Sequence, residues 1–110
     1  MVRYVPDRGD FVWLEFEPQK EKEIQKTRPA YVISVKDYNE KTRLSLCMPV
    51  TSYVKGYPFE VYIHNEYIKG AILCDQIRSL DWMARNAKFI CKSDVNTYNK
   101  VIEKFNVLVE

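Results

Sequence analysis

Short segments in which apolar and polar residues alternate fill most of the first two thirds of this 110-residue chain. In residues 11–17, Val12, Leu14 and Phe16 fall on one face, and Trp13 falls on the other face with two glutamates. A period of two residues is typical of strands that turn one face toward a core. The pattern therefore predicts a fold built mainly of β-strands.

Five further segments have strand character. Residues 30–35 are nearly all apolar, as in a central strand that is buried on both faces. Apolar and polar residues alternate in residues 44–48 and 59–63, and short apolar runs occupy residues 71–74 and 88–92. Five to seven short strands of this kind predict a small, curved β-barrel.

The connections between these strands are polar. Pro49 is expected to interrupt the strand that precedes it, just before Thr51, because proline cannot donate to a ladder. Residues 36–42 are expected to form a polar turn or a single helical turn, and residues 19–27 a mobile charged loop. No regular pattern is evident in residues 75–87.

One helix is predicted at the C-terminal end of the sequence. Apolar residues recur there at helical spacing, namely Val95, Tyr98, Val101, Ile102 and Phe105. Ser93 is the expected N-cap, with Asp94 in the first turn, and Asn106 is the expected end of the helix. Residues 1–110 are thus expected to form a single mainly β domain with helical decoration.

Charge and hydropathy exclude several classes of protein. A net charge of +2 is too small to indicate a nucleic-acid binder by composition, although residues 20–28 carry four positive and two negative side chains. The apolar stretches are too short to span a bilayer, and residues 1–10 lack the apolar core of a signal peptide. A soluble, cytoplasmic protein is therefore expected.

Few residues are available for familiar hydrolytic chemistry. His64 is the single histidine and is expected to be exposed, while Cys47, Cys74 and Cys91 are expected to be small buried residues without a zinc-site spacing. The chain has neither a glycine-rich phosphate loop nor carboxylates at a metal-binding spacing. Any chemistry is therefore expected to need no metal, no cofactor and no histidine.

One group of residues remains as a candidate site. Glu23, Arg28 and Thr51 lie in or beside the charged loop and the expected distortion at Pro49. Pro29 biases Arg28 toward an extended backbone, and an arginine held at a fixed angle can bind phosphate in a bidentate way. An Arg-Pro pair by itself is more often structural, so these residues alone leave their role open.

Ordered motifs along essentially the whole chain resemble one family. They are Tyr4-Val5-Pro6-Asp7, Gly9-Asp10, Trp13, Arg28-Pro29-Ala30, Tyr38-Asn39, Pro49-Val50-Thr51, Lys55-Gly56-Tyr57-Pro58-Phe59-Glu60-Val61, Gly70, Asp75-Gln76-Ile77-Arg78-Ser79 and Asn106-Val107-Leu108. In this order and register, they resemble the MazF/PemK toxin endoribonucleases, and the MazF branch in particular.

The resemblance implies a small SH3-like barrel of the CcdB/MazF type that forms a homodimer. It also implies a toxin that cuts single-stranded mRNA at specific short sequences without a metal and so arrests translation and growth. The 2′-hydroxyl of the RNA would be the nucleophile, leaving a 2′,3′-cyclic phosphate and a 5′-hydroxyl. A cognate antitoxin would neutralise the toxin by laying an acidic, disordered segment across its RNA groove.

The resemblance also assigns expected roles to residues. Arg28 would contact the scissile phosphate, Thr51 would donate a hydrogen bond to it, and Glu23 sits where the family has an important acid. Which residue is the general base and which the general acid stays open. Candidates for RNA binding, each with a structural role as its alternative, are Trp13, Lys55, Tyr57, Gln76 and Arg85.

Two other functions are compatible with such a barrel. A toxin of the CcdB type would bind a protein target such as gyrase and cut nothing. An inactive relative would be a plain interaction module. The Arg28-Pro29 and Pro49-Val50-Thr51 motifs argue against the first alternative, because a protein that only binds has no need of them. The presence of Glu23, Arg28 and Thr51 together argues against the second.

Overall fold

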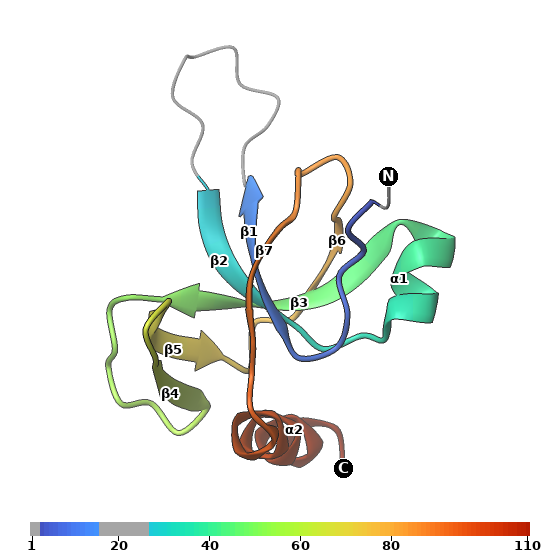
Figure 1. The fold of residues 1–110 in the computed structure, drawn as a ribbon. Coiled ribbons are helices and arrows are strands. Elements are labelled where there is room, and N and C mark those ends of the chain that lie inside the picture. The colour runs from blue at the N-terminus through green and yellow to red at the C-terminus, as the bar shows by residue number, and fades with distance from the viewer. Residues whose placement is uncertain (1–2, 16–26) are drawn as a thin grey trace.

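The structure is a computed structural model, and it describes residues 3–15 and 27–110. Within these ranges, seven strands form one bent antiparallel sheet in the order β4-β5-β3-β2-β1-β7, with β6 attached to β3 (Figure 1). The elements are β1 (Asp10–Glu15), β2 (Thr27–Val32), α1 (Lys36–Thr42), β3 (Leu44–Thr51), β4 (Glu60–His64), β5 (Lys69–Leu73), β6 (Arg78–Asp81), β7 (Lys88–Lys92) and α2 (Val95–Val109). The predicted mainly β fold with a C-terminal helix is confirmed.

The strand β3 holds the sheet together because it pairs with three neighbours. Its first half pairs with β6, its middle residues pair with β2, and Val50 and Thr51 pair with β5. The prediction that Pro49 interrupts this strand is wrong, since β3 continues to Thr51. Pro49 instead lies where the strand leaves β2 for β5, a position at which a missing N–H donor is tolerated.

The bend of the sheet produces two hydrophobic clusters. Phe11 and Val12 are consecutive in β1 and point to opposite faces of the sheet, so both are buried but in different clusters. A register shift against β7 lies between them. Phe11 packs on Tyr31, with ring centroids 4.8 Å apart. Val12 and Leu14 are buried in the second cluster, as the alternation predicts, while the Trp13 side chain stays 40% exposed.

Local pattern and structure differ at several boundaries. The strand predicted over residues 30–35 begins earlier, at Thr27, and ends at Val32. The polar segment 36–42 is a seven-residue helix, which is longer than a single turn. β6 was not predicted, because only four residues form it and their alternation is too short to recognise. β7 has the predicted bounds.

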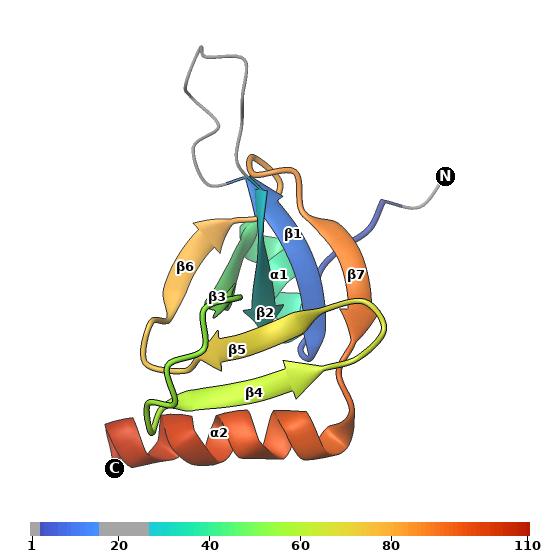
Figure 2. The same ribbon diagram turned by 90° about the vertical axis from the view of Figure 1, so that its left-hand side faces the viewer.

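The helix α2 lies beneath β4, where its Val101 is fully buried (Figure 2). Its N-cap is Asp94 rather than the predicted Ser93, because the Asp94 carboxylate accepts a hydrogen bond from the Thr97 N–H at 2.7 Å. Ser93 instead shares a 2.8 Å hydrogen bond with the Tyr31 hydroxyl. The helix also continues past Asn106 to Val109. Neither helix of the described chain is long and apolar enough to cross a membrane.

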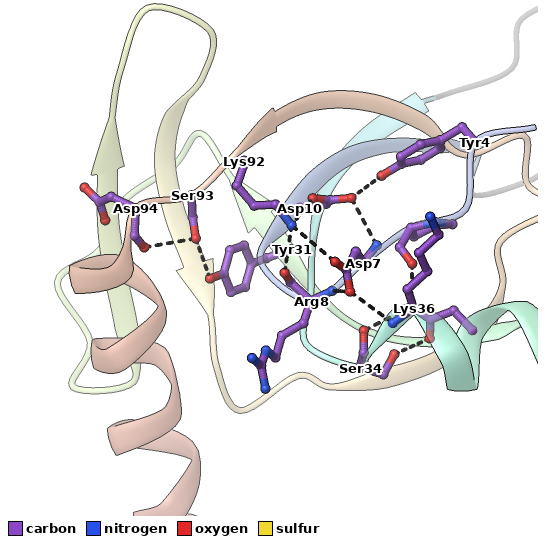
Figure 3. Close-up of polar contacts among 12 residues, drawn as sticks. Tyr4, Asp7, Arg8, Asp10, Tyr31, Ser34, Lys36, Lys92, Ser93 and Asp94 are labelled. Carbon is purple, nitrogen blue, oxygen red and sulfur yellow. Dashed lines mark hydrogen bonds and ion pairs between the residues drawn. The ribbon is translucent and has the colours of Figure 1, made fainter. Parts of the chain in front are cut away.

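A buried carboxylate fastens the N-terminal segment to the sheet (Figure 3). Asp10 is 3% exposed and accepts hydrogen bonds from the Tyr4 hydroxyl at 2.6 Å and the Asp7 N–H at 3.0 Å. Its other oxygen lies 2.7 Å from the Lys92 ammonium of β7. Burial, followed by the bond to Asp10, raises the pKa of Tyr4 well above its usual range. This network fixes where β1 begins.

Candidate active site

The candidate site forms where β2 and β3 separate. Ala30 faces Pro49 in the last pair of these antiparallel strands. If the same register continued, Arg28 would face Thr51, but Arg28 pairs with Leu14 of β1 and Thr51 pairs with Ala71 of β5. The two strands therefore part, and both residues line the cavity of about 310 Å³ that opens between them.

Three hollows of the described surface adjoin at Thr51, which lines all of them. We call the 310 Å³ cavity beside Arg28 the central hollow. A second hollow of about 630 Å³ extends from Arg28 toward Trp13. A third hollow of about 250 Å³ extends from Thr51 toward Tyr57. Because they share Thr51, we call the three hollows together the Thr51 groove.

The hydroxyl of Thr51 is held by its own backbone loop. Its oxygen accepts a hydrogen bond from the Tyr53 N–H at 3.0 Å. A hydroxyl oxygen that accepts this bond keeps its proton, which it can donate to a group in the central hollow. The backbone of β5 packs directly against that of Thr51. The approach is so close that a Cβ built on Gly70 would overlap the Thr51 carbonyl oxygen.

The central hollow has an electrostatic character that the whole chain lacks. Two guanidinium groups, those of Arg28 and Arg78, line it, and none of its described lining residues is acidic. A guanidinium stays charged at every accessible pH and presents several donors in one plane. The hollow is therefore suited to an anion such as a phosphate group.

Cys47 lies in the lining of the same hollow but is not a nucleophile. It is buried, as are Cys74 and Cys91, which confirms the prediction for the three cysteines. Burial raises the pKa of the Cys47 thiol to about 11, partly offset by its hydrogen bond with Ser45. The thiol is therefore protonated at neutral pH.

The groove brings together most of the residues that the sequence suggested. Arg28 and Thr51 flank the central hollow, and Trp13 lines the second hollow. The third hollow is lined in part by Lys55, Tyr57 and Gln76, and Gln76 also reaches the central hollow. Glu23 lies outside the described residues.

Two residues lie apart from the groove. Arg85 lines none of the three hollows, and its Nη1 donates a 3.0 Å hydrogen bond to the Glu15 carbonyl. The Glu15 N–H donates in turn to the Arg85 carbonyl at 3.0 Å, so Arg85 ties the turn before β7 to the end of β1. His64 is exposed on β4, as predicted, with its ring edge-on to Tyr62.

Sequence reasoning missed several residues that line the groove, namely Arg78, Tyr53, Tyr67 and Lys69. Arg78 lies in the motif of residues 75–79, but β6 was not recognised, so nothing in the sequence indicated that Arg78 and Arg28 line the same hollow. Of residues 3–15 and 27–110, no three His, Cys, Asp or Glu side chains cluster closely enough to hold a metal ion.

The chain is similar in sequence to known toxins. Residues 7–109 match the family model described as "PemK-like, MazF-like toxin of type II toxin-antitoxin system". Over 85 residues, the chain is 48% identical to the endoribonuclease toxin MazF of Escherichia coli strain K12, an alignment that covers 77% of each chain. It is 28% identical over 108 residues to the endoribonuclease PemK of Escherichia coli, which covers 94% of this chain and 81% of PemK.

Solved structures show the same similarity. The MazE-MazF structure from Deinococcus radiodurans in Form-II matches with a TM-score of 0.86 at 39% sequence identity, over 97% of both chains. The MazF structure from the same organism in Form-I matches with a TM-score of 0.85 at 42% identity, over 97% of this chain and 98% of that one.

Proposed function

The chain belongs to the PemK-like, MazF-like family of toxins of type II toxin–antitoxin systems, and from this premise we propose that it is a sequence-specific endoribonuclease that cuts single-stranded RNA without a metal. One observation carries the proposal: Arg28 and Thr51 flank a hollow that two guanidinium groups line. The 48% identity to a MazF endoribonuclease supports the MazF branch in particular.

The proposed reaction takes its nucleophile from the substrate. The RNA 2′-hydroxyl loses its proton to a base and forms a bond to the adjacent phosphorus, while the bond from phosphorus to the 5′-oxygen breaks. The leaving 5′-oxygen takes up a proton from an acid, so the products are a 2′,3′-cyclic phosphate and a 5′-hydroxyl. The protein must move two protons and stabilise an extra negative charge on the phosphorane.

The central hollow supplies groups that can stabilise the negative charge of the phosphorane. The Arg28 guanidinium would pair with the non-bridging phosphate oxygens, and the Thr51 hydroxyl would donate a hydrogen bond to one of them. A guanidinium is a poor general base because it keeps its proton throughout the pH range in which proteins work. Glu23 is the better chemical candidate for the base, on the argument from the family motif alone.

The rest of the Thr51 groove would hold nucleotides on either side of the scissile phosphate. Trp13 offers an exposed ring for base stacking in the second hollow, and Lys55, Tyr57 and Gln76 offer a cation, a ring and an amide in the third. For Arg85, the hydrogen bond to Glu15 supports a structural role in place of the RNA contact that the sequence suggested.

A cognate antitoxin is the expected protein partner, and the related Deinococcus radiodurans structure contains MazE with MazF. An acidic segment would suit the central hollow because it presents carboxylates where the RNA presents phosphates. We propose that the toxin acts as a homodimer in the cytoplasm, where translated mRNA is available. The comparisons support an endoribonuclease and give no support to the CcdB-type alternative.

Cleavage of a short single-stranded RNA in the presence of EDTA tests the proposal. We expect fragments with 5′-hydroxyl and 2′,3′-cyclic phosphate ends, and sequencing of the 5′-hydroxyl ends from a defined RNA pool would give the cleavage sequence. Arg28→Ala and Thr51→Ala should each lower kcat by about 10²–10³ and leave the fold intact, whereas His64→Ala should cut normally. An Arg28→Ala protein that cuts at the wild-type rate would contradict the assignment.

A further inference from the structure

The third hollow differs in charge from the central hollow. Its described lining contains one cation, Lys55, and two carboxylates, those of Glu60 and Asp75. Two carboxylates disfavour a phosphate group, which the central hollow with its two arginines accepts far better. The ligand of the third hollow is therefore expected to be uncharged, with edges that can form hydrogen bonds.

The aromatic residues of this hollow are presented to solvent. Tyr53 is 72% exposed and Tyr57 is 60% exposed. The Lys55 ammonium lies 5.5 Å from the ring centroid of each of them, so one cation contacts both rings. Flat exposed rings of this kind are surfaces on which unstacked bases stack.

The loop that carries these rings is fixed by one side chain. The Glu60 carboxylate accepts hydrogen bonds from the Gly56 N–H at 2.8 Å and from the Lys55 N–H at 3.2 Å. Gly56 has a φ of 80°, a conformation that suits glycine in such a tight turn. A loop held in this way loses little conformational entropy when a ligand binds.

The loop also connects directly to the candidate active site. The Tyr53 N–H donates to the Thr51 hydroxyl at 3.0 Å, and Thr51 and Gln76 line both the central and the third hollow. A nucleotide whose phosphate lies in the central hollow would therefore place a neighbouring base over the tyrosines. The Asp75 carboxylate and the Gln76 amide line the same hollow and could read the edge of that base.

We propose that Tyr53, Lys55 and Tyr57 form a preformed platform for one nucleobase next to the scissile phosphate, with Glu60 as its positioning residue. The proposal rests on the proposed endoribonuclease function and adds a specificity subsite to it. Tyr53, Glu60 and Asp75 are the residues that it adds to the RNA contacts expected from the sequence.

Replacing the Tyr57 ring and removing the base that stacks on it should have non-additive effects on RNA affinity. The probe is an RNA with the mapped cleavage sequence, made uncleavable by a 2′-deoxy nucleotide at the scissile position, together with versions that are abasic at one flanking position each. Tyr57→Leu should weaken binding of the intact probe about fivefold or more. It should cost nothing further on the one probe that lacks the platform's base, because the two changes remove the same contact.

Two matched variants separate stacking from general damage. Tyr62→Leu removes a tyrosine of similar exposure, 55%, from β4 outside the three hollows and should leave binding unchanged. Glu60→Ala should weaken binding as Tyr57→Leu does, whereas Glu60→Gln should retain it because an amide oxygen still accepts the Gly56 N–H. Equal losses for Tyr57→Leu on every abasic probe, or equal effects of the two tyrosine variants, would overturn the platform alone. A wild-type chain that leaves RNA intact would overturn the proposed function and the platform with it.

Discussion

The backbone of Gly70 lies against the carbonyl oxygen of Thr51 so closely that no side chain fits between them. Gly70 belongs to β5, and its neighbour Ala71 is the strand partner of Thr51. The position of Thr51 beside the central hollow therefore depends on the absence of a Cβ at Gly70 in the neighbouring strand. In the proposed reaction, this contact makes Gly70 a positioning residue for Thr51.

Gly70→Ala should both slow catalysis and destabilise the fold, because the added Cβ would meet the Thr51 backbone. The added methyl group must push Thr51 away from β5, and a misplacement of about 1 Å at a reacting centre can cost about 10²-fold in rate. We expect kcat to fall by about that factor while KM changes little, because the RNA-binding residues elsewhere in the groove keep their places. Single-turnover cleavage rates and urea unfolding of the same preparation check this.

Gly9→Ala is the matched control for Gly70→Ala. Gly9 has a φ of 92°, but a Cβ there would meet only ordinary contacts, the nearest being the Lys92 side chain at 3.5 Å. We expect a loss of about 1–2 kcal/mol in unfolding free energy from the left-handed backbone, with kcat unchanged. If Gly9→Ala slowed cleavage as much as Gly70→Ala, the rate loss would reflect stability and not the position of Thr51.

Arg78→Ala should reduce the salt dependence of RNA binding. One lost phosphate contact lowers the slope of log Kd against log salt by about 0.7 for a single strand. Arg43→Ala is the control, because the Arg43 guanidinium lies 3.6 Å from the Asp81 carboxylate and outside the three hollows. Fluorescence anisotropy with an uncleavable RNA, measured over about a sixfold range of salt concentration, would give both slopes. An unchanged slope for Arg78→Ala would remove Arg78 from the phosphate site.

The contrast between Arg28 and Arg78 shows what the sequence can and cannot predict. Arg28 stands beside Pro29, so a local rule already singles it out. Arg78 was missed because its position depends on β6 pairing with β3, in which Arg78 faces Cys47. Local alternation predicts that a strand exists, but it says little about which distant strand it joins.

The hollow itself depends on the same kind of long-range information. The sequence predicted an interruption of the strand at Pro49, but β3 continues through Pro49, and what changes there is the neighbouring strand, from β2 to β5. The N-cap of α2 was predicted wrongly for a similar reason. Serine is a favourable N-cap residue, but the Ser93 hydroxyl is hydrogen-bonded to the Tyr31 hydroxyl of β2, and Asp94 caps α2 instead.

Alkaline pH should destabilise the fold through buried groups that resist losing a proton. Burial raises the pKa of Tyr31 to about 12, against an opposing effect of its hydrogen bond with Ser93, and burial raises the pKa of Cys74 to about 11. A raised pKa means that the unfolded chain gives up the proton first, so stability is complete below the unfolded values and is lost as pH rises toward the folded ones.

Urea unfolding at a series of pH values checks this prediction. The unfolding free energy should decline from about pH 9 upward, where free thiols begin to ionise, and further above about pH 10, where free tyrosines do. Tyr31→Phe should flatten the decline above pH 10, and Tyr62→Phe, which changes an exposed tyrosine, should leave it as in the wild type. A decline equally steep in Tyr31→Phe would mean that other groups cause it.

The ion pair between Lys92 and Asp10 should matter for stability and not for cleavage. The Asp10 side chain is 4% exposed, whereas that of Lys92 is 50% exposed, so removing the ammonium leaves a buried carboxylate with only its bonds to Tyr4 and Asp7. We expect Lys92→Met to lower the unfolding free energy by about 2 kcal/mol, less than for a fully buried pair because water still reaches the Lys92 side. The double variant Asp10→Asn with Lys92→Met should recover part of this loss, since the unpaired charge is then gone.

Urea unfolding measures these differences, and kcat should equal the wild-type value throughout because the network lies outside the Thr51 groove. A larger loss in the double variant than in Lys92→Met would show that the Asp10 carboxylate stabilises the fold even without its cation.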